Sequence, residues 1–369
     1  MIPLHWNSDI TSPLHFSINS SLPKQLDPVV GDGTNLPISC LTRPQMEARD
    51  LLLERLKSSV KRRVSSIPPA NEGDARLGIL FSGGLDCMVL AALATECIPL
   101  DEPIDLMNVS FENPRSLKAR AKENALSNQD TLLDSYLTPD RKTGLLGFKE
   151  LQTRFPTREW RFIQINVPYQ DAMEKQQHVL DLMNPLHTVM DLSIAIAFWF
   201  ASRGIGQLYK TQNDEEYKSK AKVLLSGLGA DEQLGGYSRH RKAFEQVPEP
   251  NQEPNPWSRL VAEISFDVGR ISLRNLGRDD RIISDHGKEV RFPYLDENIV
   301  EFLSPLPIHI KTDPRYHRSV GDKMLLRLVA FELGLGRASC EAKRAVQFGA
   351  RTAKMEFSRQ KGHEDIKGR

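Results

Sequence analysis

Four short, mostly apolar segments alternate with stretches of helical periodicity through the first part of the chain. The helical stretches are residues 43–65, 88–95, 170–184 and 189–203, where apolar residues recur at helical spacing. The apolar segments are residues 77–81, 104–111, 160–167 and 221–226. They predict strands that are buried on both faces, as in a parallel sheet. Strands that alternate with helices predict a doubly wound α/β fold.

The rest of the chain divides into segments of different character. From Trp257 onward the pattern is mainly helical, which predicts a helical C-terminal cap. The polar, poorly patterned residues 112–155 are expected to form a lid or a disordered insertion. The predicted boundaries are an N-terminal arm at residues 1–42, a domain at residues 43–356 and a charged tail at residues 357–369. Within the domain, residues 43–245 would be the α/β part and residues 257–356 the cap.

The composition is that of a soluble globular protein. The 369 residues are 40% hydrophobic and 26% charged, with a formal net charge of +1. A charge so near zero argues against broad binding to nucleic acid or to an acidic membrane. The longest apolar stretch, residues 192–201, is too short to cross a bilayer, and the N-terminus shows no secretory signal. The four cysteines are scattered without a C-x-x-C pair, so we expect reduced thiols and a cytoplasmic protein.

The first candidate site is the turn that follows the strand at residues 77–81. Ser82, Gly83 and Gly84 end the strand, and a helical pattern follows. Two glycines leave backbone N–H groups uncovered, and the helix N-terminus adds positive potential, an arrangement that binds phosphate or pyrophosphate. Asp86 would repel a phosphate directly, so its expected partner is a magnesium ion shared with the phosphates. Taken alone, the same residues also fit an ordinary Gly-Gly turn with a capping aspartate.

A second glycine-rich turn follows the strand at residues 221–226. It reads G-L-G-A-D from Gly227 to Asp231 and continues to G-G-Y at Tyr237. Ligands of doubly wound sheets bind beyond the carboxyl ends of the strands, so both turns are expected at one edge. Two carboxylates, Asp86 and Asp231, can face one pyrophosphate if they share a magnesium ion. The two turns together therefore predict a site for ATP and magnesium.

These turns resemble the synthetase domain of class B asparagine synthetases, which carry S-G-G-x-D-S and later S-G-E-G-x-D-E-x-x-G-G-Y. The run E-V-R-F-P-Y-L-D at residues 289–296 is similar to that family's E-x-R-x-P-F-L-D. The chain is still more similar to the asparagine synthetase domain-containing proteins, through residues 200–206, 229–241, 274–280 and 343–349. The resemblance covers about residues 45–356, and the motifs are specific in combination.

The resemblance implies an adenine nucleotide alpha-hydrolase-like fold with a pyrophosphate loop. It also implies ATP-dependent amide formation, in which aspartate reacts with ATP to give β-aspartyl-AMP and pyrophosphate, and ammonia then displaces AMP. The residues implied to hold pyrophosphate and magnesium are Ser82, Gly83, Gly84, Asp86 and Asp231. Those implied to border adenosine or approach the ATP are Phe81, Val109, Ser110, Ser226 and Gly227. Arg278 is implied to position a carboxylate of the substrate aspartate.

The chain departs from the family pattern at the reacting centre. Leu228 stands where the family has a glutamate that orients aspartate or assists proton transfer, and leucine can do neither. Ala345 stands where the family has a lysine that offsets charge on the α-phosphate. Lys343 and Arg344 lie nearby, and Lys343 is the catalytic candidate to supply that charge. Cys87 replaces a serine and is a weaker donor to pyrophosphate.

Two further differences concern regions away from this centre. Full asparagine synthetases begin with Met-Cys, whose cysteine attacks glutamine in a separate glutaminase domain, whereas this chain begins Met1-Ile2-Pro3. We expect no glutaminase domain in the sequence as given, so ammonia would come from solution, from a partner or from a further domain. For Arg291, the expected role is a structural ion pair near Asp296.

The leading hypothesis is an ATP-dependent amidoligase that makes asparagine, AMP and pyrophosphate from aspartate, ATP and ammonia, with glutamine as the source where a glutaminase is supplied. The alternative is an ATP-binding interaction or regulatory module that keeps the fold without the chemistry, which Leu228 and Ala345 favour. Another pyrophosphate-loop enzyme, such as an NAD or GMP synthetase, explains the first turn but not the second. An unrelated α/β protein explains the pair of turns least well.

Overall fold

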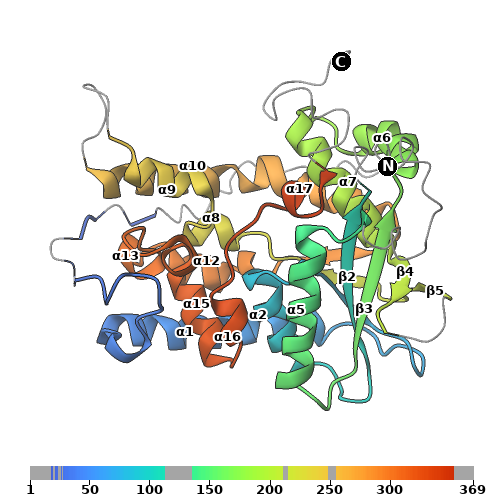
Figure 1. Ribbon diagram of the computed structural model, residues 1–369, viewed down its shortest axis with the longest axis horizontal. Helices are drawn as coiled ribbons and strands as arrows, with labels where there is room; N and C mark the ends of the chain where they lie inside the picture. The colour runs from blue at the N-terminus through green and yellow to red at the C-terminus, as the bar shows by residue number, and fades with distance from the viewer. Residues whose placement is uncertain are drawn as a thin grey trace, which may run out of the picture.

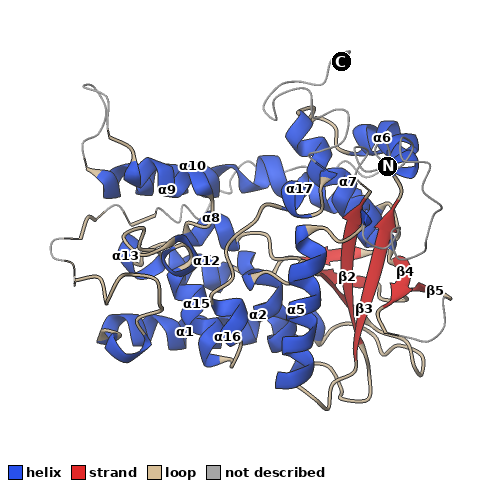
Figure 2. Cartoon of the chain, viewed as in Figure 1, coloured by secondary structure: helices blue, strands red, loops and turns tan. Residues whose placement is uncertain are grey.

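The computed structural model contains a seven-stranded sheet with helices on both faces (Figures 1 and 2). The predicted α/β fold is confirmed. The spatial order of the strands is β5-β4-β3-β2-β1-β6-β7. The structure describes residues 18–19, 21–23, 26, 28–112, 135–210, 215–247 and 255–352, so the predicted tail lies outside the described residues.

Five neighbouring strands of the sheet are parallel. They are β1 (Leu77–Leu80), β2 (Ile104–Phe111), β3 (Trp160–Val167), β6 (Val223–Leu225) and β7 (Glu289–Arg291). β2 and β3 have the bounds that the apolar pattern predicts, and β6 is shorter than its predicted segment. The apolar pattern therefore locates the centre of the sheet but not β7.

The sheet is mixed, whereas the sequence predicted a parallel one. β4 (Ile205–Leu208) runs antiparallel to β3, and β5 (Glu216–Lys218) runs antiparallel to β4. Both strands are short and partly exposed, with polar residues among the apolar ones. Edge strands of this kind have no continuous apolar run, so the pattern gives no sign of them.

Successive residues of the central strands point to opposite faces and enter two separate cores. Leu77 and Ile79 of β1 pack with the helices α1 (Arg43–Val64), α2 (Leu85–Thr95), α5 (Pro139–Arg154) and α15 (Met324–Glu332). Leu80 and Leu224 pack on the other face, with α6 (Tyr169–Leu182), α7 (Val189–Arg203) and α11 (Gly277–Ser284). Helix α15, from the C-terminal part of the chain, therefore shares a core with the helices α1 and α2 from its N-terminal part.

Helix α5 lies inside the segment that was expected to be a lid or a disordered insertion. Thr138 caps its N-terminus by accepting from the backbone N–H of Arg141, and Pro139 occupies the first turn. Arg141 is buried and its Nε donates to Asn108 Oδ1 of β2 at 2.6 Å. Buried polar side chains hide the helix from an apolar-pattern prediction, which is wrong for residues 139–154; residues 113–134 lie outside the described residues.

The remaining helical elements surround the C-terminal ends of the parallel strands or pack beside α1. They are α8 (Ala230–Leu234), α9 (Ser238–Glu245), α10 (Pro256–Ile271), a π-helical turn (Ser272–Leu276), α12 (Glu297–Leu303), α13 (Ile308–Lys311), α14 (Arg318–Gly321), α16 (Gly336–Ser339) and α17 (Val346–Gly349), with 3₁₀ turns at Ile38–Cys40 and Pro293–Leu295. Within the described part of the chain, no helix combines the length and the apolar character needed to span a bilayer. Val29 and Leu36 of the N-terminal arm pack against Tyr316 and Met324.

Arg291 does not pair with Asp296, contrary to the sequence-based expectation. Its Nε donates to Glu289 at 2.7 Å, and its Nη1 donates to the carbonyl oxygen of Arg63. Asp296 instead accepts from Arg62 and Arg63, each at 2.6 Å. The C-terminal turn of α1 supplies both guanidinium groups, a long-range contact that the local motif does not reveal.

Candidate active site

The two glycine-rich turns meet because β1 and β6 are neighbours in the sheet, with Leu77 opposite Val223. A Cβ atom on Gly227 would lie 2.9 Å from Cβ of Asp86, so glycine lets the second turn approach the first. Gly83 has a φ of +76°, and a Cβ there would lie 2.3 Å from the carbonyl oxygen of Thr143 in α5. Both glycines are therefore needed for close packing at this edge.

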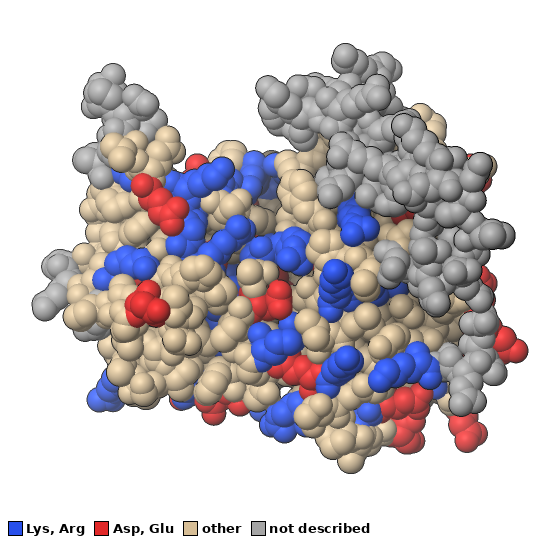
Figure 3. Space-filling model, in the orientation of Figure 1, with Lys and Arg blue, Asp and Glu red and all other residues tan. Residues whose placement is uncertain are grey.

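A cavity of about 440 Å³ opens beside these turns. Both turns line it, together with α7, residues 267–279 and the segment at residues 341–348. Its volume is within the usual range for a small-molecule site. Lys and Arg side chains gather in a band across the middle of the face shown in Figure 3, with acidic side chains among them. The site thus combines a cavity with a high density of charge.

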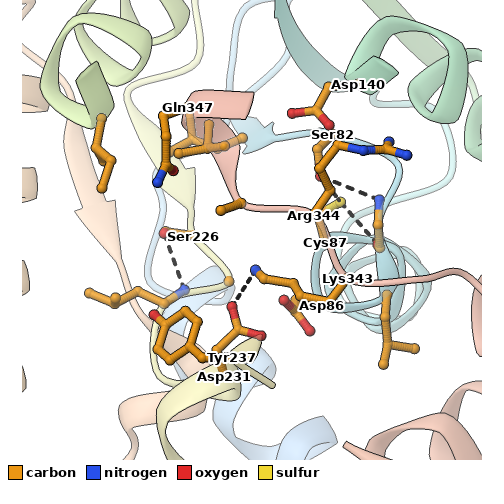
Figure 4. Close-up of a pocket in the computed structure, with 18 of the residues that line it drawn as sticks. Ser82, Asp86, Cys87, Asp140, Ser226, Asp231, Tyr237, Lys343, Arg344 and Gln347 are labelled. Atoms are coloured by element: carbon orange, nitrogen blue, oxygen red, sulfur yellow. Dashed lines mark hydrogen bonds and ion pairs between the residues drawn. The ribbon is translucent and has the colours of Figure 1, made fainter. Parts of the chain in front are cut away.

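Four charged side chains, Asp86, Asp231, Lys323 and Lys343, form a cluster in the cavity. Figure 4 labels three of them: Asp86, Asp231 and Lys343. Lys323 Nζ lies 2.6 Å from Asp86 Oδ1 and 2.8 Å from Asp231 Oδ1, and Lys343 forms an ion pair with the other oxygen of Asp231. Burial opposes ionisation of Asp231, but Lys323 and Lys343 outweigh it and lower the pKa of its carboxyl group. Burial likewise opposes ionisation of Lys343, yet Asp231 and Asp86 raise its pKa. Asp231 and Lys343 are therefore both charged at neutral pH.

The carboxylates of Asp86 and Asp231 fit a magnesium ion in their chemistry and their mutual placement. Magnesium prefers oxygen ligands and is usually held by one or two carboxylates together with substrate phosphates. Here both carboxylates converge on a single cation, the Lys323 ammonium group. A magnesium ion bound by both would require Lys323 to move aside, and a phosphate oxygen is the partner that such a lysine could take.

The residues expected near adenosine do not all reach the cavity. Phe81 and Val109 line it, as do Ser226 and Gly227. Ser110 is fully buried, and its hydroxyl lies 2.6 Å from that of Thr138. Residues of a strand alternate between faces, so the strand end that presents Val109 turns its neighbour away.

Ser82 and Cys87 lie on the first turn. Ser82 Oγ accepts from the backbone N–H of Gly84 at 3.3 Å, and Cys87 Sγ donates to the carbonyl oxygen of Gly84 at 3.2 Å. Burial raises the pKa of the Cys87 thiol, so it remains protonated. Both side chains stabilise the turn itself and border the cavity.

Asp140, at the first turn of α5, is a buried carboxyl group that the sequence did not single out. It lines the cavity near Ser82 and Arg344 (Figure 4) and is only 5% exposed. Burial raises its pKa to about 7, while Arg344 and Lys343 act in the opposite direction. No ion pair to its carboxyl group is found among the described residues. Asp140 therefore changes its charge near neutral pH.

Leu228, Ala345 and Arg278 also line the cavity. Arg278 is buried and donates to Asp191 at 2.7 Å and to Asp279 at 2.8 Å. Burial lowers the pKa of its guanidinium group, but Asp279 and Asp191 outweigh this and raise it. The structure thus holds Arg278 charged, in ion pairs with Asp191 and Asp279.

Comparisons with known proteins agree with these motifs. Residues 176–333 match the asparagine synthase family, a region that includes Asp231, Arg278 and Lys323. The chain contains an asparagine synthase domain. It is 46% identical over 307 residues to asparagine synthetase domain-containing protein 1 of Mus musculus, covering 79% of this chain and 48% of the mouse protein. The Homo sapiens protein of that name is 44% identical over 344 residues, covering 85% of this chain and 52% of the relative.

The similarity also extends to proteins named as enzymes. The asparagine synthetase [glutamine-hydrolyzing] of Gallus gallus is 24% identical over 242 residues, which cover 64% of this chain and 33% of the chicken protein. The chain spans about half the length of the curated relatives it matches at higher identity. The matches to these relatives therefore extend over more of the chain than the family match at residues 176–333.

Several residues that shape the site of this asparagine synthase domain escaped the sequence analysis. Lys323 has a left-handed backbone, with φ of +56°, and is almost fully buried. Its only local signal is a lysine directly before the apolar run of α15. Arg327 is fully buried and donates to the carbonyl oxygens of Ser339 and Glu341, which positions the segment that carries Lys343. Tyr294 donates its hydroxyl to the carbonyl oxygen of Asp86 at 3.0 Å.

Proposed function

We propose that the asparagine synthase domain of this chain is an ATP-dependent amidoligase that forms asparagine from aspartate, ATP and ammonia. The observation that supports it most is the convergence of Asp86 and Asp231 on Lys323. The two carboxylates come from separate glycine-rich turns at one edge of the sheet. A pyrophosphate group between such turns would account for the glycines, the two carboxylates and the two lysines together.

ATP would bind with its triphosphate at the two turns. Backbone N–H groups of the first turn and the N-terminus of α2 would contact phosphate oxygens, while Phe81 and Val109 would border the adenosine. Magnesium, when bound by Asp86 and Asp231, would neutralise negative charge on the phosphates. Lys323, released from the carboxylates, would then donate to a phosphate oxygen.

The reaction would proceed in two substitutions. An oxygen of the aspartate side-chain carboxylate attacks the α-phosphorus of ATP, the bond to the β-phosphate oxygen breaks, and pyrophosphate leaves. Ammonia then attacks the activated carbonyl carbon, loses a proton and displaces AMP. Arg278 would hold a carboxylate of the substrate, and Lys343 would offset charge that develops on the α-phosphate. Ammonia would come from solution, from a glutaminase partner or from a further domain.

A second candidate is an ATP-binding interaction or regulatory module without ligase chemistry. It is favoured by Leu228 and Ala345, which leave the reacting side of the cavity without a carboxylate and an ammonium group. Lys343, the nearby cation, is held in an ion pair with Asp231. In such a module, the contacts proposed above between ATP and the two glycine-rich turns would stabilise one conformation of the protein without any reaction of the nucleotide.

The decisive experiment is aspartate-dependent exchange of labelled pyrophosphate into ATP by the purified chain. It tests the first substitution without any source of ammonia. Exchange that requires both aspartate and magnesium supports the amidoligase. ATP binding without exchange at any aspartate concentration supports the module instead. Absence of both binding and exchange would contradict the two proposals together.

The compartment is part of the same proposal. Cys40, Cys87, Cys97 and Cys340 are free thiols in the structure. Free thiols are typical of a reducing compartment, and a cytoplasmic location would also supply the ATP that the reaction needs.

A further inference from the structure

A second cavity lies at the opposite edge of the sheet from the candidate active site. Its volume is about 520 Å³, and none of its lining residues lines the first cavity. Asp74 lies ahead of β1, Lys222 directly precedes β6, and Lys288 directly precedes β7. The amino-terminal ends of three neighbouring parallel strands therefore form its floor. We propose that this cavity is a binding site for a small anion that carries several phosphate groups.

The charge of the lining carries the proposal. The basic residues around the cavity are Arg203, Lys218, Lys220, Lys222 and Lys288, and the acidic lining residue is Asp74. The whole chain has a formal net charge of only +1, so this concentration of positive charge is local. Among the residues that the structure describes, none of the five basic groups forms an ion pair with a carboxylate. Clustered cations repel one another, and a multivalent anion would reduce that repulsion.

Lys288 forms the buried part of the site. Its Nζ donates to the carbonyl oxygen of Ala221 at 2.5 Å and to that of Ser219 at 3.4 Å, which leaves a further hydrogen for a ligand. Burial lowers the pKa of Lys288 to about 8; the buried Asp105 acts in the opposite direction, and Lys222 and Lys218 act in the same direction as burial. A bound anion would stabilise the charged form of this ammonium group.

Arg203 contributes a donor that has no partner in the described structure. Its guanidinium carbon lies 5.2 Å from the centre of the Phe200 ring, and its Nε is buried without a hydrogen bond. A buried N–H group without an acceptor is costly in free energy. The guanidinium group of Arg203 also lines the cavity and adds a positive charge to that of Lys288, from a different part of the chain.

The shape and the side chains favour a small polyphosphate over a nucleic acid. Proteins that bind single strands stack bases on aromatic side chains, and the lining of this cavity contains no Phe, Tyr or Trp among the described residues. A cavity of about 520 Å³ accommodates a few phosphate groups but not a length of strand. The ligand class is therefore a compact phosphate ester or inorganic polyphosphate.

The test uses inorganic tripolyphosphate and isothermal titration calorimetry on the full chain. Lys218→Gln/Lys220→Gln/Lys222→Gln removes three exposed charges without disturbing the core. The matched control, Lys61→Gln/Lys149→Gln/Lys242→Gln, removes three exposed lysines elsewhere. Three exposed ion contacts together are worth about a tenfold change in affinity. We expect that loss in the first variant, less than a twofold change in the control, and weaker binding as salt is raised.

The phosphate turns of the first cavity also attract tripolyphosphate, so Lys323→Gln serves to separate the two binding events. We expect the event that depends on the three lysines to persist in Lys323→Gln, whether or not the chain has ligase activity. Equal affinity in the wild type and the first triple variant would overturn the proposal, as would an equal loss in the control. Tighter binding of a single-stranded oligonucleotide, lost in the same triple variant, would replace it with a nucleic-acid surface.

Discussion

The two sides of the first cavity differ in what they retain. On the phosphate side, two glycine-rich turns meet closely, and Asp86 and Asp231 are paired with lysines. On the reacting side, Leu228 and Ala345 line the cavity, and the resemblance to asparagine synthetases implies a glutamate and a lysine at these positions. The comparison separates two requirements of a ligase. Nucleotide binding depends on backbone geometry and charge pairing, whereas rate depends on charged groups that act in the transition state.

The largest expected effect concerns Lys323. Lys323→Met leaves two little-exposed carboxylates without their shared cation, which typically destabilises a protein by about 3–5 kcal/mol. Urea unfolding monitored by circular dichroism measures the change, and added magnesium should restore part of the lost stability. Lys311→Met is the matched control, because Lys311 is equally buried but donates only to the carbonyl oxygen of Leu303 among the described residues. Similar losses of unfolding free energy in Lys323→Met and Lys311→Met would show that the unpaired carboxylates of Asp86 and Asp231 do not cause the destabilisation.

The second prediction restores the reacting side. Wild-type chain should bind ATP with slow or undetectable pyrophosphate exchange, and Leu228→Glu/Ala345→Lys should raise the exchange rate by roughly 10²–10³. Leu228→Glu alone and Ala345→Lys alone are the controls, which show whether the two effects on the exchange rate are additive. A wild-type rate equal to that of an ordinary asparagine synthetase would mean that Lys343 or Arg344 already supplies the charge. Unchanged exchange in the double variant, with ATP still bound, would favour the module.

The third prediction uses pH to test the buried carboxyl group on the phosphate side. Asp140 has a raised pKa of about 7, so the unfolded chain releases this proton at lower pH than the folded one. Its contribution to stability is therefore present at pH 4 and is lost as pH rises toward 7, by roughly 4 kcal/mol. Asp140→Asn should remove this dependence, so that the variant gains stability relative to wild type between pH 4 and 7. A difference in unfolding free energy between wild type and Asp140→Asn that does not change with pH would show that the Asp140 carboxyl group is in contact with water.

The smallest expected effect is on nucleotide affinity. Asp86→Asn and Asp231→Asn should each weaken binding of a non-hydrolysable ATP analogue about tenfold at millimolar magnesium. The double variant should be little worse than either single one, because both remove one shared ion. Asp296→Asn, at a carboxylate paired with Arg62 and Arg63, is the control and should leave affinity unchanged. Unchanged affinity in both single variants would reject the shared-magnesium assignment.

How far the sequence predicts the fold depends on where its apolar residues lie. β2, β3 and α7 were located correctly because they are long apolar runs with clear limits. β4 and β5 lie at an edge and are too short and too polar to produce such a run. Helix α5 was missed because its buried face carries Asp140 and Arg141. A pattern of apolar residues detects only elements that bury apolar side chains.

The candidate site shows a similar limit. Glycines and aspartates next to strand ends marked both turns, since the turn chemistry is local in sequence. Lys323 and Tyr294 could not be found in this way, because their roles come from contacts with Asp86 across the fold. Ser110 was expected near adenosine because it lies at the end of a strand. Its side chain points to the other face of the sheet, where its hydroxyl lies beside that of Thr138.

The sheet order has a consequence for how the chain acquires its nucleotide site during synthesis. β1 lies between β2, which follows it closely in the sequence, and β6, which follows much later. A ribosome therefore releases Asp86 long before Asp231, and Lys323 later still. Contacts between distant segments form slowly, so the two turns and their lysine would come together only near the end of translation. A nascent chain that is stalled before α15 is synthesised should therefore not bind ATP, even when both glycine-rich turns have left the exit tunnel.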